Sequence, residues 1–212
     1  MQTVSEIRRD YKLKTLDETS VSSEAIKQFE KWWNEALESS IDEVNAMTLA
    51  TANAAGIPSA RVVLLKGYSE KGFIFFTNYL SRKGKELAEN PMACIIFFWK
   101  ELERQVRING IVEKVSEQES DDYFKSRPAA SKAGAWASPQ SSVIESRKSL
   151  ENNFFKVQEQ YPDNNIPRPA HWGGYIVKPL NIEFWQGRAS RLHDRLLYTK
   201  KDAGWVIERL AP

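Results

Sequence analysis

Short stretches typical of β-strands follow one another closely between residues 46 and 115, and their density limits what the chain can fold into. They are rich in aliphatic and aromatic residues and are separated by short connections. One of them, 92–99, is a continuous apolar run, so we expect it to be buried on both faces. A series of short, closely spaced strands predicts a mainly β fold with added helices (α+β), built on a small antiparallel barrel. The expected strands cover residues 46–52, 57–66, 73–78, 92–99 and 105–115, and the second is expected to pair with the first. The chain is expected to close with a hairpin formed by residues 196–198 and 205–209.

The segment 61–83 reads RVVLLKGYSEKGFIFFTNYLSRK and carries a cation at each end of its first strand. We expect the two apolar runs to pair as a hairpin, because Gly and Ser lie in the turn between them. Side chains alternate along a strand, so Arg61 and Lys66 point to opposite faces and could serve two anionic groups. The helix that follows brings Arg82 and Lys83 beside free backbone amides, an arrangement that binds phosphate. The alternative from these residues alone is a solvated charge cluster.

Two S-x-x-E patterns predict helix starts at Ser116 and Ser142. On the first helix Tyr123 and Arg127 share a face. The proline after Arg127 predicts a break, so that Ser131 falls on a second short helix. Two hydroxyls and a guanidinium that converge would hold a phosphate, whereas the alternative is an ordinary amphipathic helix.

Two further helices are expected. The helix headed by Ser142 runs to about residue 161 and has Gln140 and Ser141 just ahead of its exposed amides. The other covers residues 22–39, where apolar residues recur at helical spacing. Its expected buried face consists of Ile26, Phe29, Trp33 and Leu37.

The composition excludes several classes of protein. A net charge of +2 from 30 basic and 28 acidic residues argues against a nucleic-acid coat or a membrane-surface protein. Two histidines and one cysteine offer no metal-ligand cluster. Cys94 can form no intrachain disulfide, which favours a reducing compartment and a buried thiol. The N-terminus has no apolar core typical of a signal peptide, so we expect a cytoplasmic protein.

The run 182–195, IEFWQGRASRLHDR, gathers Arg and His side chains beside a Trp, which is unusual for a core strand. It resembles the C-terminal motif of the pyridoxine/pyridoxamine 5′-phosphate oxidase family. Other segments resemble that family in order and spacing, namely RVVLLK, FFTNYLSRK, ERQVR, YFKSRP, GAWASPQSS and the terminal ERLAP. The resemblance covers essentially the whole chain. It implies an FMN-binding split β-barrel of antiparallel, Greek-key type as a single domain over residues 1–212, with a flexible N-terminal arm over about 1–20.

The resemblance also implies the residues of the site, with one departure, since Phe76 stands where some relatives carry Tyr. The implied FMN-binding residues are Arg61, Val62, Val63, Leu64, Leu65, Lys66, Phe76, Thr77, Arg82, Lys83, Gln105, Gln140, Ser141, Trp185 and Arg195. The implied substrate-binding residues are Arg8, Tyr11, Lys66, Tyr123, Arg127, Ser131, Arg191 and His193. Of these, Arg191 and His193 face the substrate ring and are the implied catalytic residues, whereas we expect His171 to be structural.

The reaction implied by the resemblance is the oxidation of pyridoxamine or pyridoxine 5′-phosphate to pyridoxal 5′-phosphate, the last step of vitamin B6 cofactor synthesis and salvage. Hydride passes from the substrate C4′ to flavin N5, and dioxygen is reduced to hydrogen peroxide. The implied assembly is a homodimer with FMN at the interface. Two alternatives stay open, a split-barrel flavoenzyme with another substrate and a non-catalytic flavin-binding or B6-phosphate-binding protein.

Overall fold

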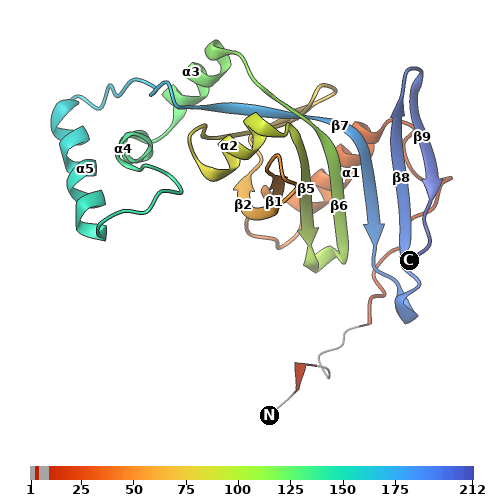
Figure 1. The fold of residues 1–212 in the computed structure, drawn as a ribbon. Coiled ribbons are helices and arrows are strands. Elements are labelled where there is room, and N and C mark those ends of the chain that lie inside the picture. The colour runs from red at the N-terminus through yellow and green to blue at the C-terminus, as the bar shows by residue number, and fades with distance from the viewer. Residues whose placement is uncertain (1–2, 5–9) are drawn as a thin grey trace. The chain divides into compact units, whose positions relative to one another are not determined.

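The computed structural model of the chain describes residues 3–4 and 10–212, so Arg8 lies outside the described residues. The helices of this part of the chain are drawn in Figure 1. They are α1 (Ala25–Leu37), α2 (Arg82–Glu89), α3 (Glu117–Ser126), α4 (Ala129–Ala137) and α5 (Arg147–Gln160). None of the helices in the described part of the chain has both the length and the apolar character needed to cross a membrane.

The strands form one hydrogen-bonded sheet in the order β2-β1-β5-β6-β7-β4-β3, with β8 paired to β7 and β9 paired to β8. The pairs β3–β4, β4–β7, β7–β8 and β8–β9 are all antiparallel. An antiparallel, mainly β fold with added helices is therefore confirmed. The strands are β1 (Ala46–Ala52), β2 (Pro58–Leu64), β3 (Gly67–Ser69), β4 (Gly72–Asn78), β5 (Met92–Trp99), β6 (Arg104–Lys114), β7 (Trp172–Gln186), β8 (Asp194–Lys201) and β9 (Gly204–Arg209).

The chain forms two compact units, each assembled from separate segments. Unit 1 consists of Met1–Leu49, Cys94–Gly110 and Pro179–Pro212. Unit 2 consists of Ala50–Ala93 and Ile111–Lys178. The expectation of a single domain stays a prediction.

The core of unit 1 is aromatic and is built around α1. Phe29 is fully buried on this helix, and its ring centroid lies 5.4 Å from that of Phe97. Trp32 packs edge-on against Phe184 at 5.2 Å, and Phe184 packs against Tyr198 at 5.3 Å. Rings at these distances add specific contacts to the burial of their large apolar surfaces.

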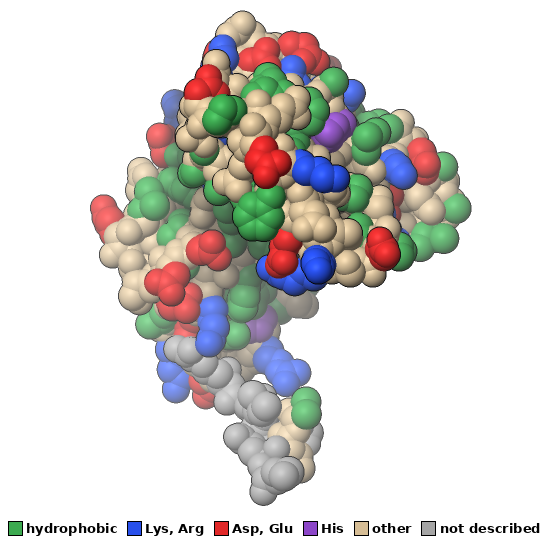
Figure 2. Space-filling model, turned by 90° about the vertical axis from the view of Figure 1, so that its left-hand side faces the viewer, with side chains coloured by type: hydrophobic (Ala, Val, Ile, Leu, Met, Phe, Trp, Pro, Cys, Tyr) green, Lys and Arg blue, Asp and Glu red, His purple; other side chains and the backbone are tan. Residues whose placement is uncertain are grey.

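Unit 2 contains a second aromatic core on β4 and β7 together with the helices α2 to α5. The ring of Phe75 lies 5.7 Å from that of Tyr175, and Phe124 packs edge-on against Trp172 at 5.0 Å. Burial raises the pKa of Tyr175 to about 12, with the neighbouring Tyr79 adding to the effect, so this phenol stays neutral. Figure 2 shows acidic and basic side chains intermingled over one face of the molecule, as the near-zero net charge predicts.

The expected hairpin of segment 61–83 is partly wrong. The first apolar run belongs to β2, whose neighbour in the sheet is β1, and β2 lies at the end of the strand order. The hairpin partner of β4 is the short strand β3, with Ser69 opposite Gly72. The expected pairing of residues from 57 onward with 46–52 is confirmed, since β2 is the neighbour of β1. The apolar pattern indicates each strand but not which neighbouring strand it pairs with.

The expected helix start at Ser142 is also wrong. Helix α5 begins at Arg147, and its N-cap is Ser146, which accepts a hydrogen bond from the backbone of Ser149. Because the Ser149 side chain accepts from the Ser146 backbone in return, this pair forms the capping box. Gln140 therefore lies in a loop rather than at a helix N-terminus.

Two expectations about burial are corrected as well. Strand β5 alternates between buried and accessible positions, and Phe98 is 56% exposed, so only one face is buried. On α1 the buried face runs through Trp32 and Ala36, whereas Leu37 is 57% exposed.

Other expectations are confirmed. Helix α2 follows the segment that ends in β4, Ser116 caps α3, and Arg127 is extended (φ −72°, ψ 149°), so that Ser131 lies on the separate helix α4. The final hairpin is formed by β8 and β9.

The part of the N-terminal segment that the structure describes is attached to unit 1. The carboxylate of Glu103 accepts hydrogen bonds from the backbone of Lys12 at 2.8 Å and Leu13 at 3.0 Å. Leu16 is buried, and its backbone donates to Asp194 at 3.1 Å. The flexibility of an arm over about 1–20 stays a prediction.

The core of unit 1 generates the first prediction. Phe29→Ala should lower the free energy of unfolding by about 3–5 kcal/mol, because it removes a fully buried ring and leaves a cavity. Urea denaturation followed by circular dichroism measures this difference. Val143→Ala, at a fully exposed loop position, is the control and should change stability by less than about 0.5 kcal/mol. Equal changes in the free energy of unfolding for the two substitutions would show that packing of α1 does not stabilise the core of unit 1.

Candidate functional site

A buried carboxylate organises the cations of unit 2. Glu86, on α2, is 5% exposed and accepts hydrogen bonds from Thr51 at 2.5 Å and Ser59 at 2.6 Å. It also pairs with Arg61 at 3.3 Å and with Arg82 at 2.9 Å. These five residues are called the Glu86 cluster below. Arg61 donates to Thr51 and Ser59 as well, so its guanidinium is fixed on the face of β2 that carries Ser59.

The cluster keeps Glu86 ionised. Burial raises the pKa of this carboxyl, but hydrogen bonds from Ser59, Thr51 and Arg82 and the charge of Arg61 outweigh it and lower the pKa to about 2. A carboxylate that accepts several donors and faces cations favours its charged form. Glu86 thus offsets the mutual repulsion of the cations that converge on α2.

Lys83, in the first turn of α2, is a buried cation whose hydrogen-bond partners are neutral. Its Nζ donates to Gln140 at 2.9 Å and to Thr77 at 3.1 Å. Burial and the nearby charge of Arg61 together lower its pKa to about 8, with Glu86 opposing the shift. Because no described carboxylate forms an ion pair with Lys83, its charge is available to an anion at the N-terminus of α2.

The strand residues next to Arg61 differ in exposure. Val62 is 68% exposed, whereas Leu65 is buried. Lys66 follows the end of β2, and its backbone donates to Ile74 at 2.8 Å. Lys66 and Tyr123 line the same cavity of about 490 Å³ on the surface of unit 2.

A second cavity, of about 280 Å³, is called the Arg127 pocket. One guanidinium nitrogen of Arg127, Nη1, is buried and has no hydrogen-bond partner within the described residues. Such an orphaned donor is costly unless a ligand satisfies it. Burial lowers the pKa of Arg127, with Tyr123 opposing the shift, and the group remains a cation. The pocket is lined by Asn78, Arg127, Ser131, Gly134, Ala135, Ser138, Gln140 and Trp172.

Stacked aromatic rings lie beside this pocket. Phe76 stacks on Tyr123, at 3.9 Å between ring centroids, and on Trp172, at 5.5 Å, and all three rings are nearly parallel. The guanidinium of Arg127 lies over Trp172 at 4.6 Å. A guanidinium held over an aromatic face keeps its in-plane N–H groups free to bind an anion.

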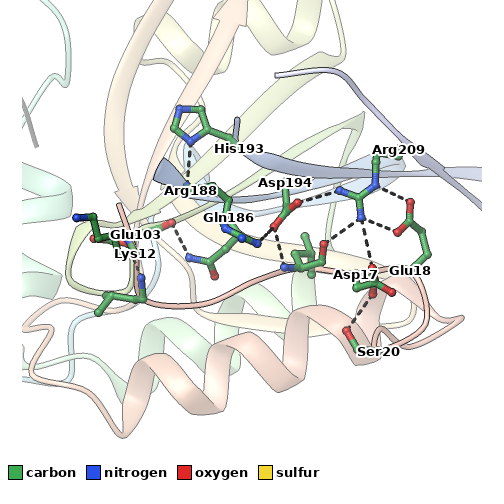
Figure 3. Close-up of polar contacts among 12 residues, drawn as sticks. Lys12, Asp17, Glu18, Ser20, Glu103, Gln186, Arg188, His193, Asp194 and Arg209 are labelled. Atoms are coloured by element: carbon green, nitrogen blue, oxygen red, sulfur yellow. Dashed lines mark hydrogen bonds and ion pairs between the residues drawn. The ribbon is translucent and has the colours of Figure 1, made fainter. Parts of the chain in front are cut away.

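Unit 1 carries its own group of candidate residues around the loop 187–193, called the His193 loop. Trp185, near the end of β7, lies 4.7 Å from the ring of His193, and Tyr11 packs edge-on against Trp185 at 5.8 Å. His193 Nδ1 accepts a hydrogen bond from the backbone of Arg188 at 3.1 Å (Figure 3). The loop turns sharply, because Ser190 and Arg191 adopt positive φ angles of 57° and 61°.

The environment of His193 disfavours its charged form. Burial lowers the pKa of His193, the cation of Arg191 lowers it further, and Asp194 opposes both. The imidazole is therefore mainly neutral at pH 7, whereas Arg191 beside it is a cation.

Arg195, on β8, is fixed by a buried carboxylate. Glu183, which is 2% exposed, accepts from Arg195 Nε at 2.8 Å and also pairs with Arg107. Arg195 Nη1 donates in addition to the backbone of Ala211 at 2.7 Å. Gln105 lies on β6.

The implied site residues thus fall into separate groups. Unit 2 brings Arg61 and Arg82 together in the Glu86 cluster and links Lys83 with Thr77 and Gln140. Within the implied phosphate cage, Arg127 and Ser131 line one cavity, whereas Lys66 and Tyr123 line another. Unit 1 carries Tyr11, Gln105, Trp185, Arg191, His193 and Arg195.

Sequence reasoning missed the residues that hold these groups in place. Neither Glu86, within an expected helix, nor Trp172, at the start of an expected strand, carries a local pattern that marks it as part of a site. Glu183 and Asp194 lie inside the C-terminal motif but were not distinguished from its other polar residues.

Two family models match the chain. The model described as "Pyridoxamine 5'-phosphate oxidase" matches residues 33–161. The model described as "Pyridoxine 5'-phosphate oxidase C-terminal dimerisation region" matches residues 172–212.

Curated relatives match over the full length. A pyridoxine/pyridoxamine 5′-phosphate oxidase from Trichormus variabilis is 57% identical over 212 residues, which cover 100% of this chain and 99% of the relative. A protein of the same name from Paraburkholderia phymatum is 57% identical over 213 residues and is covered completely, as is this chain.

Solved structures share the fold. PhzG from Burkholderia lata 383, crystallised with tetrahydrophenazine-1-carboxylic acid, is 31% identical with a TM-score of 0.88, over 94% of this chain and 99% of that chain. A pyridoxamine 5′-phosphate oxidase-related, FMN binding protein from Nostoc punctiforme is 20% identical with a TM-score of 0.70, over 87% of this chain and 97% of that chain. The predicted split-barrel fold class is confirmed.

The Glu86 cluster generates the second prediction. A carboxyl whose folded pKa of about 2 lies below its ordinary 4.5 adds stability that is fully present above pH 4.5 and is lost as pH falls toward 2. Glu86→Gln should lower the free energy of unfolding at pH 7 by about 1–3 kcal/mol and flatten its decline between pH 4.5 and 2.

Urea denaturation at a series of pH values measures both effects. Glu89→Gln, an exposed carboxylate on the same helix, is the matched control and should follow the wild-type curve. A Glu86→Gln protein with the wild-type pH dependence would show that this carboxyl is not held ionised by the cluster.

Proposed function

Because the chain belongs to the pyridoxine/pyridoxamine 5′-phosphate oxidase family, we propose that it oxidises pyridoxamine and pyridoxine 5′-phosphate to pyridoxal 5′-phosphate, with FMN as cofactor and dioxygen as acceptor. The observation that carries the proposal is the Arg127 pocket, where a buried guanidinium keeps one nitrogen without a partner among the described residues. A phosphomonoester supplies the oxygens that such a donor requires.

The described residues fit FMN. Its phosphate requires fixed cations, and Lys83 with its neutral partners and Arg61 in the Glu86 cluster provide them in one unit. When bound, the flavin supplies the hydride acceptor and passes electrons to dioxygen. We assign FMN binding to residues 61–66, together with Phe76, Thr77, Arg82, Lys83, Gln105, Gln140, Ser141, Trp185 and Arg195.

The substrate phosphate is assigned to Arg127 and Ser131, with Lys66 and Tyr123 completing its cage. Arg127 and Ser131 already line one cavity, and the stack on Phe76 joins Tyr123 to the ring under the guanidinium of Arg127. Arginine suits this role because it stays protonated and donates two parallel hydrogen bonds to phosphate oxygens.

Arg191 and His193 are assigned to the substrate ring. The cation of Arg191 steadies negative charge on the ring, and the neutral imidazole of His193 orients the ring through a hydrogen bond. Tyr11, packed against Trp185, covers the same region of unit 1. No side chain is assigned as a general base.

The proposed assembly is a homodimer with FMN at the interface. Its support is the match of residues 172–212 to a C-terminal dimerisation region. A cytoplasmic location is proposed as well, since the single cysteine, Cys94, is free and suits a reducing compartment.

The function is tested by two measurements on one sample. The purified protein should show a flavin absorption spectrum and should consume dioxygen when pyridoxamine 5′-phosphate is added. A flavin spectrum without oxygen uptake would favour a non-catalytic binding protein. Uptake with tetrahydrophenazine-1-carboxylic acid but not with the B6 phosphates would favour a function related to that of the PhzG relative.

The Arg127 pocket generates the third prediction. Arg127→Ala should weaken substrate binding by about 1.5–3 kcal/mol, or roughly 10- to 150-fold, because it removes charge-assisted hydrogen bonds to the phosphate. FMN binding should change by much less. Titration of the apoprotein with FMN and of the flavin-loaded protein with pyridoxal 5′-phosphate measures the two affinities.

Arg147→Ala is the control, since this arginine is exposed and its charge lies outside the pocket. It should leave both affinities unchanged. Equal losses of FMN and product affinity in Arg127→Ala would contradict the assignment of this residue to the substrate phosphate.

A further inference from the structure

The backbone of the His193 loop selects one tautomer of His193. The N–H of Arg188 donates to Nδ1 of His193 at 3.1 Å, so Nδ1 must present its lone pair. A neutral imidazole that accepts at Nδ1 carries its proton on Nε2. Protonation of Nδ1 would place two N–H groups against each other, and this agrees with the lowered pKa of His193.

The side chain of Arg188 is anchored by Asp194. Its Nη1 pairs with Asp194 Oδ2 at 2.9 Å, and the same carboxylate accepts from the backbone of Leu16 at 3.1 Å and from Arg209 at 2.9 Å. Figure 3 shows these contacts converging on Asp194, with Arg209 held in turn by Glu18. Burial raises the pKa of Asp194, but these hydrogen bonds outweigh it, so the carboxylate is charged at neutral pH.

We propose that Asp194 is a positioning residue, which acts through Arg188 to fix His193 as the neutral tautomer that donates from Nε2 to the substrate. The carboxylate oxygens of Asp194 accept hydrogen bonds from Arg188, Leu16 and Arg209 rather than from the imidazole. Its effect on His193 therefore passes through the backbone of the loop. The catalytic part of this proposal rests on the proposed function.

The charged groups around His193 are Arg191 and Asp194 on its own segment and Arg188 at its Nδ1. The rings that pack against it belong to Trp185 and Tyr11. The positive φ angles of Ser190 and Arg191 hold the turn that returns His193 to the Arg188 amide. Loss of the Arg188–Asp194 pair should therefore loosen the turn without removing any group that touches the imidazole.

The experiment uses the flavin-loaded protein labelled with ¹⁵N at histidine. The chain has two histidines, so the spectrum contains the signals of two imidazole rings. In the His171→Gln protein the remaining signals belong to His193. Two-bond ¹H–¹⁵N correlations distinguish a protonated ring nitrogen from one with a free lone pair. In the wild type we expect His193 to show its proton on Nε2 and a free lone pair on Nδ1.

Asp194→Asn and Arg188→Gln should both produce a mixture of tautomers at His193. The rate of flavin reduction by saturating pyridoxamine 5′-phosphate should fall about 2- to 10-fold, the range of one ordinary hydrogen bond. Glu18→Gln is the matched control. It removes a partner of Arg209 but leaves the Arg188–Asp194 pair, and it should keep both the tautomer and the rate.

Arg188 is 37% exposed, so its substitution should leave the fold intact even if Asp194→Asn does not fold. Wild-type tautomer or wild-type rate in Arg188→Gln would overturn the proposal, as would equal effects of Glu18→Gln. If neither B6 phosphate reduced the flavin of the wild-type protein, the proposed function would be refuted. The ¹H–¹⁵N spectrum would still show which tautomer His193 adopts and whether Arg188→Gln changes it.

Discussion

The buried carboxylate of Glu86 is the interaction on which the cations of unit 2 depend. Arg61, Arg82 and Lys83 approach the same turn of α2, and their mutual repulsion would drive them apart in an uncompensated site. Glu86 offsets this repulsion with two hydroxyl donors and two guanidinium partners, and its low pKa shows that it stays charged. The result is a set of cations already in place before any anion arrives, which reduces the cost of ordering them on binding.

The cations of the molecule divide into paired and available ones. In unit 1, Arg195 is paired with Glu183, and Arg188 and Arg209 with Asp194, so their charges are largely compensated within the protein. In unit 2, Lys83 has neutral partners, and Arg127 keeps a buried nitrogen without one among the described residues. A buried cation of the second kind is costly for the folded protein alone and is explained best by a ligand that carries negative charge.

The sequence predicted the elements well, because their signals are local. Short apolar runs indicated strands such as β1 and β5, and the capping pattern at Ser116 indicated the start of α3. The pairing of β2 with β1 was right, whereas its expected hairpin with β4 was wrong, since the short strand β3 lies opposite β4 instead. The start of α5 was wrong because Ser146 rather than Ser142 caps it. The roles of site residues came from a family resemblance. Glu86 and Trp172 were not singled out, because the residues that they contact, such as Thr51 and Arg127, are distant in sequence.

The central claim is that Lys83 and Arg127, which have no carboxylate partner among the described residues, bind the ligand phosphates, with Arg61 held beside Lys83 by Glu86. Titration of the apoprotein with FMN and with riboflavin, which lacks the phosphate, tests it most directly. We expect FMN to bind more tightly, and Lys83→Met to reduce this advantage by about 10-fold or more, because one charge-assisted contact is lost. Lys85→Met, an exposed lysine on the same helix, should keep the wild-type ratio. An unchanged ratio of the two affinities in Lys83→Met would contradict the account.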